Sequence, residues 1–206
     1  MIELKNLLIA SNNAGKCKEI KEFFSGTDLQ IYTLAEWQEL HGLLQAPDAE
    51  ETGTTYLENA LIKAKVCAEW AAESGVRIST LADDSGIEVA ALGGAPGLYS
   101  ARYAGEDVSF VDNVNKMLSE LEGESDRSAL FRSVLVVYKN DAEYSSFEGI
   151  LLGKISEAPI GDGGFGYDPI FMPEGGELSL AEIKNNTSDF PTHRTVALGK
   201  FAQLFK

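Results

Sequence analysis

Apolar residues recur with two periods along the first part of the chain, which predicts strands alternating with helices. The apolar run 6–10 is short and bounded by polar residues, as expected of a strand. A helical apolar face ahead of Gly26 follows it, formed by Cys17, Ile20, Phe23 and Phe24. Residues 29–34 predict a second strand. The expected order is therefore strand, loop, helix, strand.

The clearest helix is predicted over residues 56–74. Thr55 and Glu58 have the spacing of a capping box, and Gly75 is placed to end the helix. One stripe of the segment carries apolar side chains: Leu57, Leu61, Ala64, Ala68 and Ala71. This pattern is typical of an amphipathic helix.

Strand patterns return in the middle of the chain. Residues 78–82 and 87–92 are expected to be strands on either side of an acidic turn at 83–86. A further helix, closed by Gly123, is predicted from Val111, Val114, Leu118 and Leu121.

Two long strands are predicted over residues 129–138 and 143–156. The turn-rich residues 139–142 join them, which favours an antiparallel hairpin. A glycine-rich loop follows, and the chain closes on a helix with Val196, Phe201 and Phe205. Helices interspersed with strands, together with a hairpin, predict an α/β fold with a mixed β-sheet.

Length and composition indicate one globular domain over residues 1–206. The chain has 17 basic and 32 acidic residues, a formal net charge of −15, which argues against a protein that binds a nucleic-acid polymer along its backbone. A small anionic substrate is compatible with this charge. Surface charges are screened over roughly 8 Å, so a few local cations and a bound metal can outweigh the overall field.

The two cysteines, Cys17 and Cys67, lack the spacing of a disulfide framework or a zinc site and are interpreted as reduced packing residues. No apolar run reaches the roughly 18 residues of a membrane span. The first 13 residues do not have the pattern of a signal peptide. We therefore expect no membrane association and a cytoplasmic location.

The first candidate site is the segment 11–16, Ser-Asn-Asn-Ala-Gly-Lys, between the first predicted strand and helix. Backbone N–H groups and the helix dipole favour an anion there, and Lys16 adds a positive charge. Ala10 and Cys17 stand where a P-loop has a glycine and a hydroxyl residue, so the segment is not a P-loop. A polar turn with a solvated lysine is the alternative interpretation.

The second candidate is the acidic turn. Two adjacent carboxylates, Asp83 and Asp84, repel each other unless a cation or hydrogen-bond donors compensate, and Mg²⁺ prefers such oxygen ligands. Glu50 and Glu51 precede the long helix and could reach the same metal. An ordinary turn and solvated loop charges are the alternatives.

Two loops carry further candidates. The glycine-rich and proline-containing loop 93–105 offers Arg102 to an anion, unless it is a simple surface loop. In the loop 161–169, Phe165 lies between glycines that permit close approach and suits a ring-stacking platform, with a packed loop as the alternative. Two residues just before the last helix could bind a ligand or be structural: His193 and Arg194.

These segments and their order are similar to those of one enzyme family. The sequence carries SNNAGK, EETG, ENALIKA, LADDSG, GGAPGLYSARYAG, GGFGYDPIF and THR before the last helix. Nearly end to end, the chain resembles the inosine triphosphate pyrophosphatases, also called non-canonical purine NTP or dITP/XTP pyrophosphatases. The resemblance implies an elongated mixed β-sheet flanked by helices, with two lobes around a central cleft, in a homodimer.

The resemblance also implies a function, the hydrolysis of ITP, dITP and XTP to the monophosphate and pyrophosphate with Mg²⁺ as cofactor. Asp84 and Lys16 would be the catalytic residues, and Asp84 and Glu50 the metal ligands. The residues implied to bind the nucleoside triphosphate are Ser11, Asn12, Asn13, Ala14, Gly15, Lys16, Ser85, Phe165, Gly166, Tyr167, Asp168, Lys184, His193 and Arg194.

In the implied mechanism, water attacks the α-phosphorus and Asp84 orients or deprotonates it, while Lys16 offsets the charge on the departing pyrophosphate. The 6-oxo group of hypoxanthine or xanthine would accept hydrogen bonds from Arg194 or from backbone donors. The 6-amino group of adenine would leave those donors unpaired, which is a costly mismatch.

The chain departs from the family pattern near its end. Residues 185–192 separate Lys184 from His193, and Thr192 stands where the family has serine. The sequence leaves two alternatives: a Maf-type nucleotide pyrophosphatase that acts on pyrimidine or modified nucleotides, and a nucleotide-binding regulator without turnover. The Maf-type enzymes lack the GGFGYDP and terminal His-Arg segments found here.

Overall fold

The computed structural model describes residues 4–139, 143–187 and 189–205. Its strands are β1 Asn6–Ile9, β2 Gln30–Tyr32, β3 Ser79–Val89, β4 Ser128–Tyr138, β5 Tyr144–Ile155 and β6 Phe171–Pro173. Its α-helices are α1 Ala14–Phe23, α2 Leu34–His41, α3 Tyr56–Ala72, α4 Phe110–Glu120, α5 Leu180–Asn186 and α6 His193–Ala202. Short 3₁₀ helices cover Ala90–Leu92, Gly97–Arg102, Asp168–Ile170 and Gln203–Phe205.

The six strands form one mixed sheet in the order β2-β1-β3-β4-β5-β6, which confirms the predicted α/β class. β1 pairs in parallel with β2 and with β3, and β5 pairs antiparallel with β6. At one end of the hairpin, the Lys139 N–H donates to the Glu143 carbonyl at 2.8 Å. At the other end, the Ile155 N–H donates to the Arg127 carbonyl at 2.9 Å, so β4 and β5 run in opposite directions. The hairpin is confirmed, and its turn residues 140–142 lie outside the described residues.

The chain divides into two compact units. Unit 1 comprises Met1–Asp84, Ser133–Gly149 and Arg194–Lys206, and unit 2 comprises Ser85–Arg132 and Ile150–His193. Both units are assembled from segments far apart in the sequence, and β3, β4 and β5 each begin in one unit and end in the other. The single domain expected over residues 1–206 stays a prediction.

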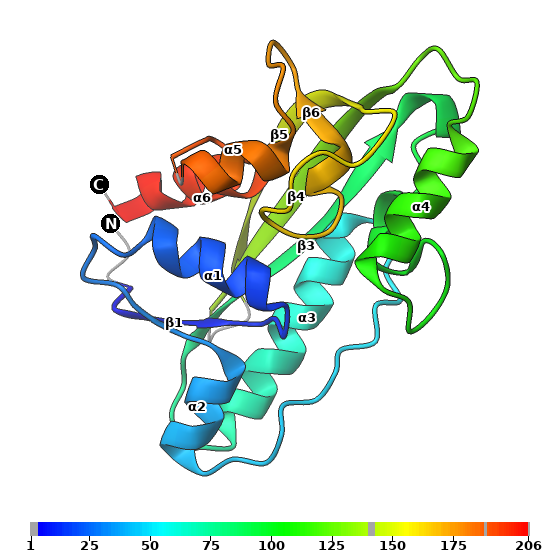
Figure 1. The fold of residues 1–206 in the computed structure, drawn as a ribbon. Helices are drawn as coiled ribbons and strands as arrows, with labels where there is room; N and C mark the ends of the chain where they lie inside the picture. The colour runs from blue at the N-terminus through cyan, green and yellow to red at the C-terminus, as the bar shows by residue number, and fades with distance from the viewer. Residues whose placement is uncertain (1–3, 140–142, 188, 206) are drawn as a thin grey trace. The chain divides into compact units, whose positions relative to one another are not determined.

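Unit 1 has helices on both faces of its strands. Successive side chains of a strand point to opposite faces. Leu8 and Ala82 accordingly pack with α2 and α3, whereas Leu7 and Leu81 pack with α1 and α6. In Figure 1, α1 and α6 lie on one side of β1 and α2 lies on the other. The two clusters fix β1 and β3, which carry the candidate site.

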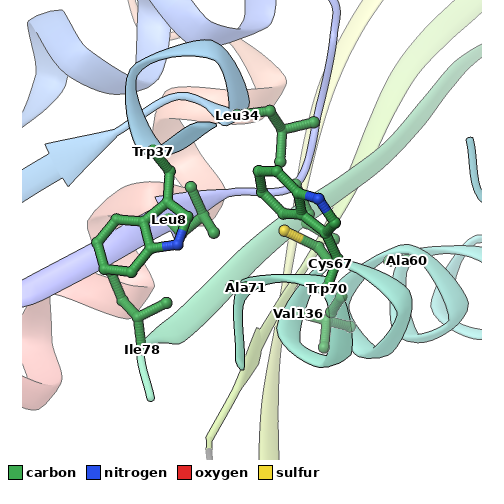
Figure 2. Close-up of a cluster of buried hydrophobic side chains, with 12 residues drawn as sticks. Leu8, Leu34, Trp37, Ala60, Cys67, Trp70, Ala71, Ile78 and Val136 are labelled. Carbon is green, nitrogen blue, oxygen red and sulfur yellow. The ribbon is translucent and has the colours of Figure 1, made fainter. Parts of the chain in front are cut away.

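The cluster on the α2 and α3 side contains both tryptophans of the chain. Trp37 and Trp70 are nearly fully buried there, and Figure 2 shows their rings among the aliphatic side chains that surround them. The Trp70 indole N–H donates to the Leu44 carbonyl at 3.0 Å, so the buried ring also ties down the segment that leads to α3. Burying a large apolar side chain contributes about 1.5 to 3 kcal/mol.

Unit 2 has its own core. α4 and α5 supply Val114, Met117 and Leu180 to one cluster. The residues that complete this cluster are Ile87, Val89, Leu121, Ala129, Phe131, Ile155, Tyr167, Ile170 and Phe171. The core therefore holds the loop before β6, which contains Phe165, against α5.

The predicted helix over 56–74 is confirmed as α3. Its capping box is present, because the Glu58 N–H donates to Thr55 Oγ1 at 3.2 Å and the Thr55 N–H donates to Glu58 Oε2 at 3.1 Å. In the described part of the chain, no helix is long and apolar enough to cross a membrane.

Two helices, α2 and α5, and the short strand β6 were not predicted. Both helices are brief, with eight and seven residues, so their apolar periodicity is weak. A local signal was nevertheless present, because each begins with a capping box, formed by Thr33 with Glu36 and by Ser179 with Glu182.

The predicted acidic turn at 83–86 is wrong. β3 runs without interruption from Ser79 to Val89 and includes all four of these residues. Aspartate, serine and glycine favour turns in isolation, but β3 lies between β1 and β4, and pairing on both sides overrides the local preference. Residues 90–92, which were expected to continue the second strand, instead form a 3₁₀ helix. Because these residues form a strand and not a turn, Asp83 and Asp84 point to opposite faces of the sheet.

Candidate functional site

The segment between β1 and α1 forms the predicted strand-to-helix turn in unit 1. Asn13 is the N-cap of α1, and its Oδ1 accepts a hydrogen bond from the Lys16 N–H at 3.0 Å. Ser11 Oγ accepts from the Asn13 N–H at 3.1 Å. These bonds fix Lys16 in the first turn of the helix. The other members of the predicted phosphate loop are exposed or half-buried: Asn12, Ala14 and Gly15.

Asp83 is the centre of a buried charge cluster in unit 1. Its Oδ2 lies 2.9 Å from Lys16 Nζ and 3.0 Å from Arg194 Nε. Its Oδ1 accepts a hydrogen bond from Ser133 Oγ at 2.5 Å. Burial alone would raise the pKa of Asp83, but the charges of Arg194 and Lys16 hold this pKa well below its usual value. Asp83 is therefore the ionised counter-ion of two cations.

Arg194 lies at the first turn of α6 with its guanidinium between two carboxylates. It contacts Asp83 through Nε and Glu19 through Nη1, and its side chain is only 1% exposed. Burial would lower the pKa of Arg194, but Asp83 and Glu19 raise it above its usual value. The structure thus places the guanidinium in the charge cluster of unit 1. The predicted contact of Arg194 with the base stays a prediction.

Asp84 faces α3 and has a different partner. Its Oδ1 lies 2.6 Å from Lys63 Nζ, which is also 3.3 Å from Glu51 Oε1. Its Oδ2 is buried, and no described residue donates a hydrogen bond to it. Burial raises the pKa of Asp84 above its usual value, against the opposing charge of Lys63. A buried carboxylate oxygen without a partner is costly, so this atom is suited to a proton or a cation.

The residues around Asp84 fit a magnesium ion. Asp84 and Glu51 offer hard oxygen ligands beside the same lysine. Glu50, the predicted second ligand, is exposed, whereas Glu51 is half-buried. Within the described ranges no three His, Cys or acidic side chains are grouped to hold a metal. Mg²⁺ takes one or two carboxylates and completes its shell with water and phosphate oxygens. The metal and the role of Glu50 stay predictions.

Unit 2 brings together three of the predicted base-binding residues. Asp168 Oδ2 accepts hydrogen bonds from the Phe165 N–H at 2.8 Å and from Lys184 Nζ at 2.9 Å. Lys184 Nζ also lies 5.1 Å from the centre of the Phe165 ring, within cation–π range. Gly164 has φ +72°, and a Cβ there would collide with Asp168 Oδ2, so glycine is required at this position.

Other predicted substrate residues of unit 2 have partners inside the protein. The Tyr167 hydroxyl donates to the Ser100 carbonyl at 2.8 Å, and Ser100 Oγ accepts from the Ile87 N–H at 2.9 Å. His193 is buried and stacks on Phe131, with ring centres 4.7 Å apart and planes at 12°. Contacts of these residues with substrate stay predictions. Of the two remaining candidates, Ser85 is half-buried, and Gly166 has a positive φ of 65°, a conformation that favours glycine.

Three residues that pair with predicted site residues had no role predicted from the sequence: Lys63, Glu19 and Ser133. Lys63 lies within the ENALIKA segment, but its contact with Asp84 joins residues 21 apart, so no local pattern specifies it. Ser133 lies on the buried strand β4 and contacts Asp83, and Glu19 lies on α1 and contacts Arg194. Only the folded structure brings these pairs together.

Comparison with known proteins gives consistent matches over almost the whole chain. The family model described as the Ham1 family matches residues 7–204. The chain is 39% identical over 203 residues to a "dITP/XTP pyrophosphatase" from Bacillus licheniformis, with 98% of each protein covered. Among solved structures it is similar to the Staphylococcus aureus Ham1 protein, at 36% identity, TM-score 0.81 and 98% coverage of both chains. It is also similar to a HAM1 protein from Coxiella burnetii, at 34% identity, TM-score 0.82 and 98% coverage of both.

Proposed function

The chain belongs to the Ham1 family, and we propose that it hydrolyses ITP, dITP and XTP to the monophosphate and pyrophosphate. The names of its relatives support this activity, since they specify dITP and XTP as substrates. The observation that carries the proposal is Asp84, a buried carboxylate with a raised pKa and an oxygen that no described donor satisfies. Perturbed carboxylates of this kind are typical of catalytic sites.

In the proposed reaction a water oxygen attacks the α-phosphorus, the bond from this phosphorus to the bridging oxygen breaks, and pyrophosphate leaves. Asp84 accepts the proton of the water, which its raised pKa favours. Lys16 binds the phosphates. It shares Asp83 Oδ2 with Arg194, so its positive charge is only partly neutralised before substrate binds. Mg²⁺ held by Asp84, and by Glu50 or Glu51, would polarise phosphate oxygens.

Turnover of a substrate panel tests the activity. The purified protein is incubated with ITP, XTP, dITP, ATP and TTP plus Mg²⁺, and pyrophosphate is resolved from orthophosphate. We expect pyrophosphate from the first three substrates. Preference for TTP would instead support a Maf-type enzyme, and nucleotide binding without pyrophosphate would support a regulator.

Carboxylate variants test the metal site. Asp84→Asn is expected to lower turnover by at least about 100-fold, because both the proton acceptor and the metal charge are lost. Glu50→Gln and Glu51→Gln form a matched pair for the second ligand. The variant that raises the Mg²⁺ concentration for half-maximal activity identifies it. Full activity in EDTA, or near-normal activity of Asp84→Asn, would contradict the proposed metal site.

The resemblance also leads us to propose a homodimer with a cytoplasmic location. Light scattering during size-exclusion chromatography tests the assembly, with an expected mass of twice the 22.3 kDa chain. A mass equal to one chain at micromolar concentration would contradict the dimer. Fractionation of the source cells tests the location.

A further inference from the structure

An exposed aromatic side chain lies beside the predicted base platform of unit 2. Phe110, the first residue of α4, is 48% exposed, and its ring centre lies 6.5 Å from that of Phe165 with the planes at 49°. A single exposed apolar residue is common on protein surfaces. This one, however, adjoins a second ring that is itself only half-buried, so the two rings offer a joint apolar surface to a ligand.

The position of Phe110 is fixed by the backbone around it. Ser109 caps α4 with a complete capping box, so the helix has a defined start. The buried side chain of Asn113 donates to the Ala101 carbonyl at 3.0 Å and accepts from the Ala104 N–H at 2.7 Å. These bonds anchor the first turn of α4 to the loop around residues 97–105. The ring of Phe110 is therefore presented from a preorganised turn, at low entropic cost to a ligand.

The neighbouring platform is fixed as well. One carboxylate oxygen of Asp168, Oδ2, accepts hydrogen bonds from both the backbone N–H of Phe165 and the amine of Lys184. Phe165 thus lies close to a cation that can donate hydrogen bonds. This combination suits a flat aromatic ring system that carries a carbonyl acceptor.

We propose that Phe110 is a further substrate-binding residue, which contacts the purine base of the nucleotide beside Phe165. This inference rests on the proposed function and deepens it, because it assigns to the base a contact outside the segments that resemble the family. Because the ring planes are at 49°, a base stacked on Phe165 would meet Phe110 by its edge. A bicyclic base reaches farther across such a platform than a monocyclic one.

The test separates the base from the phosphates. Stacking of a base on an aromatic ring changes affinity by about 5- to 150-fold, and a half-exposed oblique ring should lie at the low end. Phe110→Ala is therefore expected to raise KM for ITP about 5-fold with kcat unchanged. Phe110→Trp should restore the wild-type KM. The inhibition constant of inorganic tripolyphosphate, which has no base, should be the same in Phe110→Ala and wild type.

Val111→Ala is the matched control. Val111 is 64% exposed and adjoins Phe110 in the first turn of α4, so its truncation removes exposed apolar surface without removing a ring. The inference is overturned if Phe110→Ala changes KM less than 2-fold, if Val111→Ala has the same effect, or if tripolyphosphate inhibition weakens equally. Calorimetric binding of inosine monophosphate to wild type and Phe110→Ala gives the same comparison without turnover. Because this binding measurement does not need turnover, a wild-type protein that is inactive on ITP would contradict only the proposed function, and the role of Phe110 in binding the base could still be tested.

Discussion

Replacing Asp83 by asparagine is expected to destabilise unit 1 while leaving its packing volume unchanged. The variant removes a negative charge that is buried between Lys16 and Arg194, at 2.9 and 3.0 Å. Asparagine can still accept the hydrogen bond of Ser133. Removing one partner of a buried ion pair costs about 3 to 5 kcal/mol, because the remaining charge is left uncompensated. Glu19 still faces Arg194, so we expect the lower end, about 3 kcal/mol.

This free energy corresponds to a fall in melting temperature of about 6 to 12 °C for a chain of this length. Thermal and urea unfolding of wild type and Asp83→Asn, followed by circular dichroism, measure it. The pH dependence gives a second readout. Since the folded-state pKa of Asp83 is lowered, its stabilising contribution is present above its unfolded pKa of about 3.9 and is lost as pH falls through the folded value. The difference between the two proteins should be constant near pH 7 and shrink below about pH 4.

The adjacent Asp84→Asn variant is the control. Because the folded-state pKa of Asp84 is raised, its stabilising contribution is present at low pH and lost as pH rises through the folded value. At pH 7, removal of this charge should therefore cost less stability than Asp83→Asn, because Lys63 keeps Glu51 as a partner. The reasoning is refuted if Asp83→Asn unfolds within about 1 kcal/mol of wild type, or if Asp84→Asn is destabilised as strongly.

Three further substitutions test the remaining contacts. Lys16→Ala should lower kcat/KM about 100- to 1,000-fold, as expected for one lost transition-state donor, and a pyrophosphate-release assay that shows less than a 10-fold fall would exclude this role. Ser100→Ala leaves the buried Ile87 N–H without its acceptor, so the free energy of unfolding measured in urea should fall by about 1 to 3 kcal/mol. An unchanged urea midpoint would contradict the importance of this hydrogen bond. Gly164→Ala combines φ +72° with a collision against Asp168, so KM for ITP should rise while tripolyphosphate inhibition is unchanged; equal loss of both would indicate general misfolding instead.

The local pattern of the sequence was sufficient for much of the fold. The capping box of Thr55 and Glu58 predicts α3, and the two long apolar runs around residues 139–142 predict the β4–β5 hairpin, because both signals depend on neighbours within a few residues. The ordered segments from SNNAGK to THR also identify the family, which the match over residues 7–204 confirms. The candidate residues Lys16, Asp84 and Phe165 follow from those segments.

Only the tertiary structure decided how the charges are paired. The sequence places Asp83 and Asp84 side by side in an expected turn, where they would repel each other and share a cation. In β3 they point to opposite faces, so Asp83 binds Lys16 and Arg194, whereas Asp84 binds Lys63. These partners lie on three helices that are distant from one another in sequence. The two aspartates point to opposite faces only because pairing with β1 and β4 makes their segment a strand, in which successive side chains alternate between the faces.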